Sequence, residues 1–140
     1  MNIISKLKSI QEKFEQHNTL NPKLWTDDKT LKKEISDKLF KVIKTYLQDS
    51  QFLKAEDILS VEIVGSNASY NYNNKSDIDM HLIVDMGKLA ADKQFAQYAN
   101  DGEKSIFNKK YDIELYGISV EVYVQDINSI TQSNGIYDLL

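Results

Sequence analysis

The chain has 140 residues, of which 41% are hydrophobic, and this size suits one globular domain with a single core. It has no cysteine, which excludes a disulfide framework and a thiolate metal site. Its 17 basic side chains are all lysines and stand against 21 acidic ones, so the formal net charge is −4 and tight nucleic-acid binding through a basic surface is disfavoured.

The N-terminus begins with a predicted amphipathic helix over residues 3–16, where Ile3, Leu7, Ile10 and Phe14 recur at helical spacing. A connector over residues 18–25 contains the only proline, and its Trp25 is expected to pack on the core. A second helix is predicted over residues 28–47, with Asp27 or Asp28 as its N-cap.

The periodicity then changes to that of strands. Residues 58–65 ("ILSVEIVG") and 78–85 ("IDMHLIVD") are predicted strands, and residues 88–99 are a predicted helix that "NDG" either caps or interrupts within a longer helix. Residues 111–126 predict two strands around Tyr116-Gly117, a hairpin, and the tail over residues 127–140 is expected to be a loop. This order predicts a single α+β domain over residues 1–140, with a small mixed sheet and helices packed on it.

Two aspartates, Asp77 and Asp79, stand at the start of the second predicted strand. Side chains two positions apart on a strand share one face, about 6.6 Å apart along its axis, so the two carboxylates aim together. Mg²⁺ prefers oxygen ligands, and one or two carboxylates with substrate phosphate suffice to hold it. Glu121, an acid in the middle of a later strand, is the candidate for a third ligand.

Gly65 ends the first predicted strand, and Ser66 follows it. A strand that ends at glycine before a short helix exposes backbone N–H groups and, here, a hydroxyl, which together can bind an anion. Gly65 lets the backbone approach closely, and Ser66 can donate to a phosphate oxygen. Lys75, in the following loop, offers a positive charge to the same anion; no arginine is available for a bidentate contact.

This order of motifs resembles the nucleotidyltransferase superfamily of DNA-polymerase-beta type. "VGS" is followed, eleven residues after the serine, by "DID" and then by the distant Glu121, where the superfamily more often has Asp. More narrowly, "LNPKLW", "GSNASYNYNNKSDIDMHLIVD" and "DIELYGISVEVYVQD" resemble nucleotidyltransferase-like proteins of tailed bacteriophages and some bacteria. That similarity covers most of the chain, residues 19–128.

The resemblance implies a nucleotidyltransferase-type fold, with a helical part over residues 1–50 before a catalytic core over residues 57–126. It implies a transferase that moves an NMP from an NTP such as ATP to an acceptor hydroxyl, using two Mg²⁺ or Mn²⁺ ions and releasing pyrophosphate. Carried over, Asp77, Asp79 and Glu121 are the catalytic metal ligands, and Gly65 and Ser66 hold the triphosphate. Lys75 is a separate candidate for a contact to the nucleotide, with a solvated loop lysine as the alternative.

The acceptor is not identified by the resemblance. The acidic net charge and the absence of arginine favour a small molecule or a protein over a nucleic acid. The chain ends soon after the last predicted strand, so we expect either that an oligomer or a partner completes the acceptor surface, or that the chain is a compact version with a small acceptor. No apolar run approaches the ~20 residues that span a bilayer, so no membrane partner is expected, and the expected location is the cytoplasm, that of the host for a phage-encoded chain.

Several alternatives remain open at this level. Asp77 and Asp79 also suit a solvated turn before a strand, and Glu114 or Asp112 compete with Glu121 for the third position. The sequence favours His81 as a half-buried strand histidine with a satisfied hydrogen bond over a role at the acceptor. Tyr70 and Tyr72 either stack on a base or pack the segment after Gly65. The alternative function is a catalytically silent nucleotide-binding or assembly module.

Overall fold

A five-stranded mixed sheet forms the centre of the protein, whose computed structural model describes residues 3, 17–70, 72–129 and 135–140. The strands are β1 (Ile58–Val64), β2 (Ile78–Val84), β3 (Glu114–Leu115), β4 (Ile118–Asp126) and β5 (Ile136–Asp138), in the order β3-β4-β2-β1-β5. β2 and β4 are parallel, and the other neighbouring pairs are antiparallel. The predicted α+β class with a mixed sheet is therefore confirmed.

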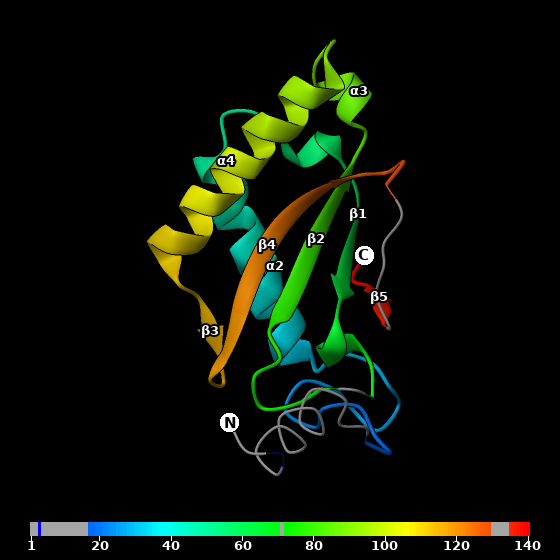
Figure 1. Ribbon diagram of the computed structural model, residues 1–140. Coiled ribbons are helices and arrows are strands. Elements are labelled where there is room, and N and C mark those ends of the chain that lie inside the picture. Colours follow the sequence, from blue (N-terminus) through cyan, green and yellow to red (C-terminus); the bar gives the residue numbers. More distant parts are fainter. Residues whose placement is uncertain (1–2, 4–16, 71, 130–134) are drawn as a thin grey trace.

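The helices of the described residues are α2 (Lys33–Asp49), α3 (Met86–Leu89) and α4 (Lys93–Tyr111), with short 3₁₀ turns at η1 (Ala55–Asp57) and η2 (Ser66–Ala68). In Figure 1, α2 lies behind the sheet and α4 passes beside β4. Tyr46 of α2 meets Phe107 of α4 edge to face, with ring centroids 5.0 Å apart, which joins the two helices in one core. The helix predicted over residues 3–16 lies, apart from Ile3, outside the described residues.

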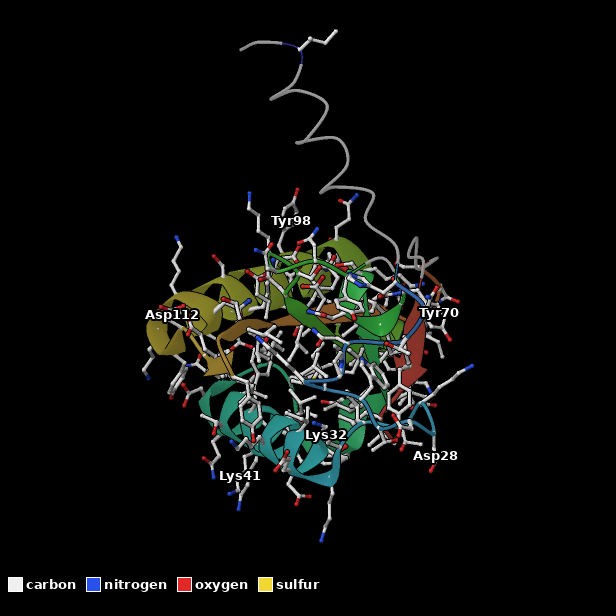
Figure 2. All side chains as sticks on the ribbon, turned by 90° about the horizontal axis from the view of Figure 1, so that it is seen from below. Asp28, Lys32, Lys41, Tyr70, Tyr98 and Asp112 are labelled. Carbon is white, nitrogen blue, oxygen red and sulfur yellow. The ribbon has the colours of Figure 1, made fainter. Side chains whose placement is uncertain are left out.

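α2 begins later than predicted, and neither Asp27 nor Asp28 caps it. The N-cap is Lys32, which makes no side-chain capping bond. Trp25 and Leu31 instead form an isolated antiparallel bridge, which holds the intervening residues in a turn. Figure 2 shows Asp28 in this turn and Lys32 at the start of α2. Burial of Leu31 and Trp25 thus outweighs the local capping preference of aspartate.

The "NDG" segment, residues 100–102, neither caps nor interrupts a helix, because α4 runs through it to Tyr111. Asn100 is buried, and its Nδ2 donates to the carbonyl of Ala96 one turn earlier at 2.8 Å. Phe107, one of the buried residues of α4, continues the face that packs on the core. The single helix predicted over residues 88–99 is wrong: α3 ends at Leu89, and α4 begins at Lys93 after its N-cap Asp92. Tertiary packing extends α4 to Tyr111.

The predicted hairpin around Tyr116-Gly117 is confirmed, and both turn residues have positive φ, as a two-residue hairpin turn requires. Its first strand, β3, is only two residues long. Farther along β4, Asn108 of α4 takes the place of a neighbouring strand: its Nδ2 donates to the carbonyl of Val122, and its Oδ1 accepts from the N–H of Val122, both at 3.0 Å. A helix side chain thus satisfies the sheet edge beside Glu121.

The tail predicted as a loop contains strand β5, so that prediction was wrong. β5 pairs antiparallel with β1, with Tyr137 opposite Ile63. Tyr137 also meets Trp25 edge to face, with ring centroids 4.8 Å apart. The three-residue strand depends on these distant partners rather than on its own periodicity, so a local pattern could not reveal it.

Candidate metal centre

Asp77 and Asp79 share one face of the sheet because residues 77–82 alternate between partly exposed and buried positions. Ile78 and Met80 are buried on the opposite face, while Asp79 is only partly exposed. Asp77 directly precedes the strand, two positions before Asp79. The alternation that burial imposes therefore places both carboxylates outside the core, as the sequence predicted.

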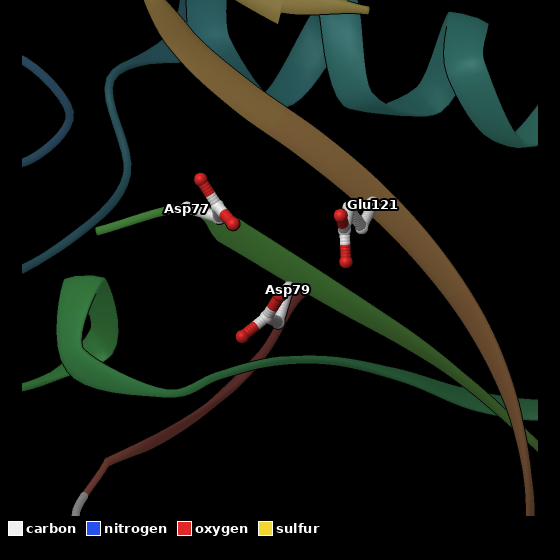
Figure 3. Close-up of side chains that lie close together, drawn as sticks. All are labelled: Asp77, Asp79 and Glu121. Carbon is white, nitrogen blue, oxygen red and sulfur yellow. The ribbon is translucent and has the colours of Figure 1, made fainter. Parts of the chain in front are cut away.

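Glu121 joins them from the neighbouring parallel strand. The register pairs Asp79 directly with Glu121, and the buried residues Val120 and Val122 on either side turn Glu121 to the face of Asp79. Each of the three carboxylates offers one oxygen, and these oxygens lie within 4.8 Å of one another. In Figure 3 the side chains of Asp77, Asp79 and Glu121 converge from the two strands. This small acidic cluster could hold a metal ion, because hard divalent cations take oxygen ligands.

The competing acids lie elsewhere. Glu114 is exposed on β3, where it pairs with Ser119, and Asp112 is the C-cap of α4 with a left-handed backbone conformation. Within the part of the chain that the structure describes, Asp77, Asp79 and Glu121 form the one cluster of this kind.

The electrostatic environment of the cluster disfavours the ionised form of Asp79. Burial raises the pKa of the Asp79 carboxyl above its ordinary value, and the charges of Glu121 and Asp77 raise it further, while His81 offsets part of this effect. A half-buried carboxylate beside two other acids is unfavourable in its ionised form. A bound cation would reverse that balance, since it stabilises all three carboxylates as anions.

Gly65 closes one side of the cluster. It has φ +89° and ψ −169°, a conformation that is essentially restricted to glycine. A Cβ atom at this position would lie 2.9 Å from Oδ2 of Asp79. β1 ends at Val64, opposite Asp79, and the chain passes through Gly65 into the η2 turn, as the sequence predicted. The close approach of backbone to carboxylate therefore explains the glycine.

The partly exposed Ser66 is hydrogen-bonded within the protein. Its Oγ donates to Oγ of Ser76 at 2.6 Å, and the N–H of Asn73 donates to the same oxygen of Ser76 at 2.9 Å. Ser76 accepts two hydrogen bonds and so keeps its own hydroxyl hydrogen for a third group. Sequence reasoning singled out Ser66 as a donor and missed Ser76, which directly precedes Asp77.

Asn67 is the residue that holds this region together, and sequence reasoning missed it. It is completely buried. Its Nδ2 donates to the carbonyls of Ser76 and Asp77 at 2.9 and 3.0 Å, and its Oδ1 accepts from Asn21 at 3.1 Å. Its backbone carbonyl accepts from Nε1 of Trp25 at 2.7 Å. Asn67 thereby ties the segment that carries Asp77 to the η2 turn and to the N-terminal connector.

The remaining candidates have local roles. Lys75 is exposed on the loop, where its backbone N–H donates to Oδ1 of Asn73. Tyr72 stacks on His17, with ring centroids 4.0 Å apart. His81 is partly exposed, and its Nδ1 lies 2.6 Å from Oε1 of Gln125, so the interpretation as a hydrogen-bonded strand histidine is confirmed.

A cavity of about 510 Å³ is lined in part by Ser76, the residue that directly precedes Asp77 in the sequence. Its lining is mostly polar and includes Lys23, which sequence reasoning did not single out. The lining residues are His17, Asn21, Lys23, Tyr72, Asn73, Asn74, Ser76, Gly117 and Ile118. The volume lies in the range of small-molecule sites. Lys75, the cation expected at the nucleotide, does not line it, whereas Lys23 does.

Comparisons with protein-family models, with curated proteins and with solved structures found no match for the chain. No helix of the described ranges combines the length and the apolar character needed to cross a membrane.

Proposed function

We propose that the protein is a metal-dependent nucleotidyltransferase of DNA-polymerase-beta type, which moves an NMP from an NTP to an acceptor hydroxyl. The observation that carries this proposal is the convergence of Asp77, Asp79 and Glu121 from two parallel strands, with one oxygen of each within 4.8 Å of the others. The Gly65 turn beside Asp79 supports it, because a side chain at position 65 would fill the space next to the carboxylate.

The donor set fits divalent cations of the Mg²⁺ or Mn²⁺ class, since all three groups are carboxylates. When bound, two such ions neutralise phosphate charge and favour loss of a proton from the attacking hydroxyl. Asp77 directly before β2, Asp79 near its start, and Glu121 within β4 would hold them. The backbone at Gly65 and the free hydroxyl hydrogen of Ser76 would contact the phosphates.

The reaction is balanced without a further reactant. The acceptor oxygen forms a bond to the α-phosphorus of the NTP, and the bond from that phosphorus to the oxygen bridging to the β-phosphate breaks. Pyrophosphate leaves with the electron pair, and the proton of the acceptor hydroxyl passes to solvent. The acidic net charge and the absence of arginine favour a small-molecule or protein acceptor.

The test is transfer of label from each α-labelled NTP to components of a cell lysate in the presence of Mg²⁺ or Mn²⁺, with pyrophosphate measured in parallel. Wild-type protein and the matched control Glu114→Gln are expected to transfer label. The double variant Asp77→Asn/Asp79→Asn is expected to lose both label transfer and pyrophosphate release. Equal signals from wild type and the double variant would overturn the enzymatic proposal, and metal-dependent NTP binding without transfer would favour a silent binding module.

A further inference from the structure

Another cavity, also of about 510 Å³, is lined by the end of α2, the loop that follows it and the second half of α4. It is separate from the acidic cluster, none of whose residues lines it. Two aromatic residues form its floor: Tyr46 and Phe107 are 1% and 4% exposed and meet edge to face. The volume lies in the range of small-molecule sites.

The hydroxyl of Tyr46 is buried at this floor and has no hydrogen-bond partner among the described residues. Burial raises the pKa of this phenol, and the charges of Glu103 and Asp101 raise it further. The hydroxyl is therefore neutral at pH 7 and lies on the side of α4, which carries both acids. A buried hydroxyl without a partner costs free energy, and a polar group of a ligand in the cavity would remove that cost.

The carboxylate of Glu103 is fixed in the wall of the same cavity. Its Oε1 accepts from Oγ of Ser50 at 2.6 Å, and its Oε2 accepts from the N–H of Gln51 at 2.7 Å. Both donors are neutral, and each carboxylate oxygen can accept a further hydrogen bond. Within the described ranges no lysine pairs with Glu103, whereas the other acid of the cavity, Asp49, is paired with Lys110 at 3.5 Å. The lining thus carries one unmatched negative charge.

The surroundings of this charge favour a cation with an apolar body. α2 ends at Asp49 with no basic side chain in its last turn, so its C-terminal carbonyls add negative potential to the cavity. The apolar part of the lining consists of Phe52, Ile106 and Phe107, and phenylalanine rings attract cations to their faces. An anion would be repelled by Glu103 and by the helix end, and a neutral ligand would leave Glu103 unmatched.

We propose that this cavity binds a small primary amine, as its ammonium ion, with an aromatic or branched aliphatic body. One N–H of the ammonium donates to the carboxylate of Glu103, and another donates to the hydroxyl oxygen of Tyr46, which has lone pairs to accept it. The body of the ligand lies against Phe107. The site does not depend on nucleotidyl transfer, because it shares no residue with the acidic cluster.

The first test compares probes of matched shape on wild-type protein by isothermal titration. Phenethylamine and isopentylamine represent the two bodies; phenethyl alcohol replaces the charge by a hydroxyl, hydrocinnamate reverses it, and ethylamine lacks the body. At least one of the two larger amines is expected to bind about 10-fold or more tightly than each of the other three probes, because only the larger amines join a positive charge to an apolar body. Failure of both larger amines to bind, or equally tight binding of the alcohol or the carboxylate, would overturn the proposal.

Tyr46→Phe gives a second test with two readouts of opposite sign. It is expected to raise the Tm of the ligand-free protein, because it removes the unpartnered hydroxyl, and to weaken binding of the larger amine by about 3–10-fold. A residue with a packing role alone would not change stability and affinity in opposite directions. Tyr98→Phe, which removes the hydroxyl of an exposed tyrosine of α4, is the control and is expected to change neither.

Glu103→Gln tests the charge and is expected to weaken binding of the amine by about 10-fold or more. Glu34→Gln makes the same change in the first turn of α2, at the opposite end of that helix, and is expected to bind like wild type. Thermal unfolding shows that each variant is folded; should Glu103→Gln loosen the loop after α2, the probe series and Tyr46→Phe still decide the question. Unchanged affinity in a folded Glu103→Gln or in Tyr46→Phe would overturn this site.

Discussion

Gly65 and Asp79 approach each other so closely that a Cβ atom at position 65 would lie 2.9 Å from Oδ2 of Asp79. Gly65→Ala is therefore expected to destabilise the fold by about 2–4 kcal/mol, because alanine is strained at this φ and ψ and because the carboxylate must move. Urea unfolding measures the loss of stability, and the Mg²⁺-induced rise in Tm measures the displacement of Asp79.

Gly117→Ala is the matched control for this variant. Gly117 also has a positive φ, +77°, but a Cβ atom there would meet nothing within 4 Å. It is expected to cost only about 1–2 kcal/mol of backbone strain and to keep the full response to Mg²⁺. If both variants respond to Mg²⁺ like wild type, the Gly65 contact does not position Asp79.

Asp79→Asn is expected to raise Tm in the absence of divalent cations. Burial and the neighbouring acids raise the folded-state pKa of Asp79, so its ionised form is less favourable in the folded protein than in the unfolded chain. The penalty is fully present above the folded pKa and disappears as the pH falls below the unfolded value of about 3.9. Thermal unfolding between pH 4 and pH 8 with EDTA should show the advantage of the variant growing as the pH rises.

With Mg²⁺ added, wild-type protein is expected to have a higher Tm than Asp79→Asn, because asparagine is a weaker metal ligand than a carboxylate. An Asp79→Asn protein that is less stable than wild type at neutral pH with EDTA would contradict the electrostatic account of the cluster.

Glu121→Gln tests whether Glu121, rather than Glu114 on the neighbouring strand β3, is the third metal ligand. Residues that merely orient a ligand are worth about 10–100-fold in metal affinity, so removing a direct ligand should weaken Mg²⁺ binding at least as much. Glu114→Gln, which changes an exposed acid outside the cluster, should leave the Mg²⁺-induced shift in Tm unchanged. Isothermal titration with Mg²⁺ gives both affinities, and equal affinities would remove Glu121 from the proposed ligand set.

Sequence reasoning placed the acidic residues well because burial imposes alternation on the strands. Ile78, Met80 and Leu82 alternate with polar residues in the first half of β2, so the face of Asp79 follows from a local pattern. The alternation of Val120 and Val122 around Glu121 works in the same way. What joins the two strands is the parallel pairing of Asp79 with Glu121, a contact between residues 42 positions apart (121 − 79) that no local pattern contains.

The elements that could not be predicted depend on distant partners. β5 exists because the edge of β1 accepts it and because Tyr137 packs on Trp25, at opposite ends of the chain. α2 starts late because Trp25 and Leu31 pair and are buried, which outweighs the capping preference of Asp27 and Asp28. In these places tertiary contacts decide between conformations whose local free energies differ by only about 1 kcal/mol.

Asn67 shows the same dependence at the site and provides the last prediction. Its side chain bonds to Asn21, Ser76 and Asp77, which lie 46, 9 and 10 positions away, so nothing in "GSNAS" distinguishes it from a turn residue. Asn67→Ala leaves the carbonyls of Ser76 and Asp77 without this donor in a partly buried setting. We expect a loss of about 2–4 kcal/mol in the free energy of unfolding, together with a weaker response to Mg²⁺ as Asp77 loses its anchor.

Asn74→Ala is the control for Asn67→Ala, because Asn74 is an exposed residue of the same loop. It is expected to change stability by less than about 0.5 kcal/mol. Asn67→Asp refines the test, since it keeps an acceptor for Asn21 but replaces the donor with a charged oxygen facing two carbonyls. It should therefore be at least as damaging as alanine, and an Asn67→Asp protein with wild-type stability would show that the donated hydrogen bonds do not hold the segment before β2.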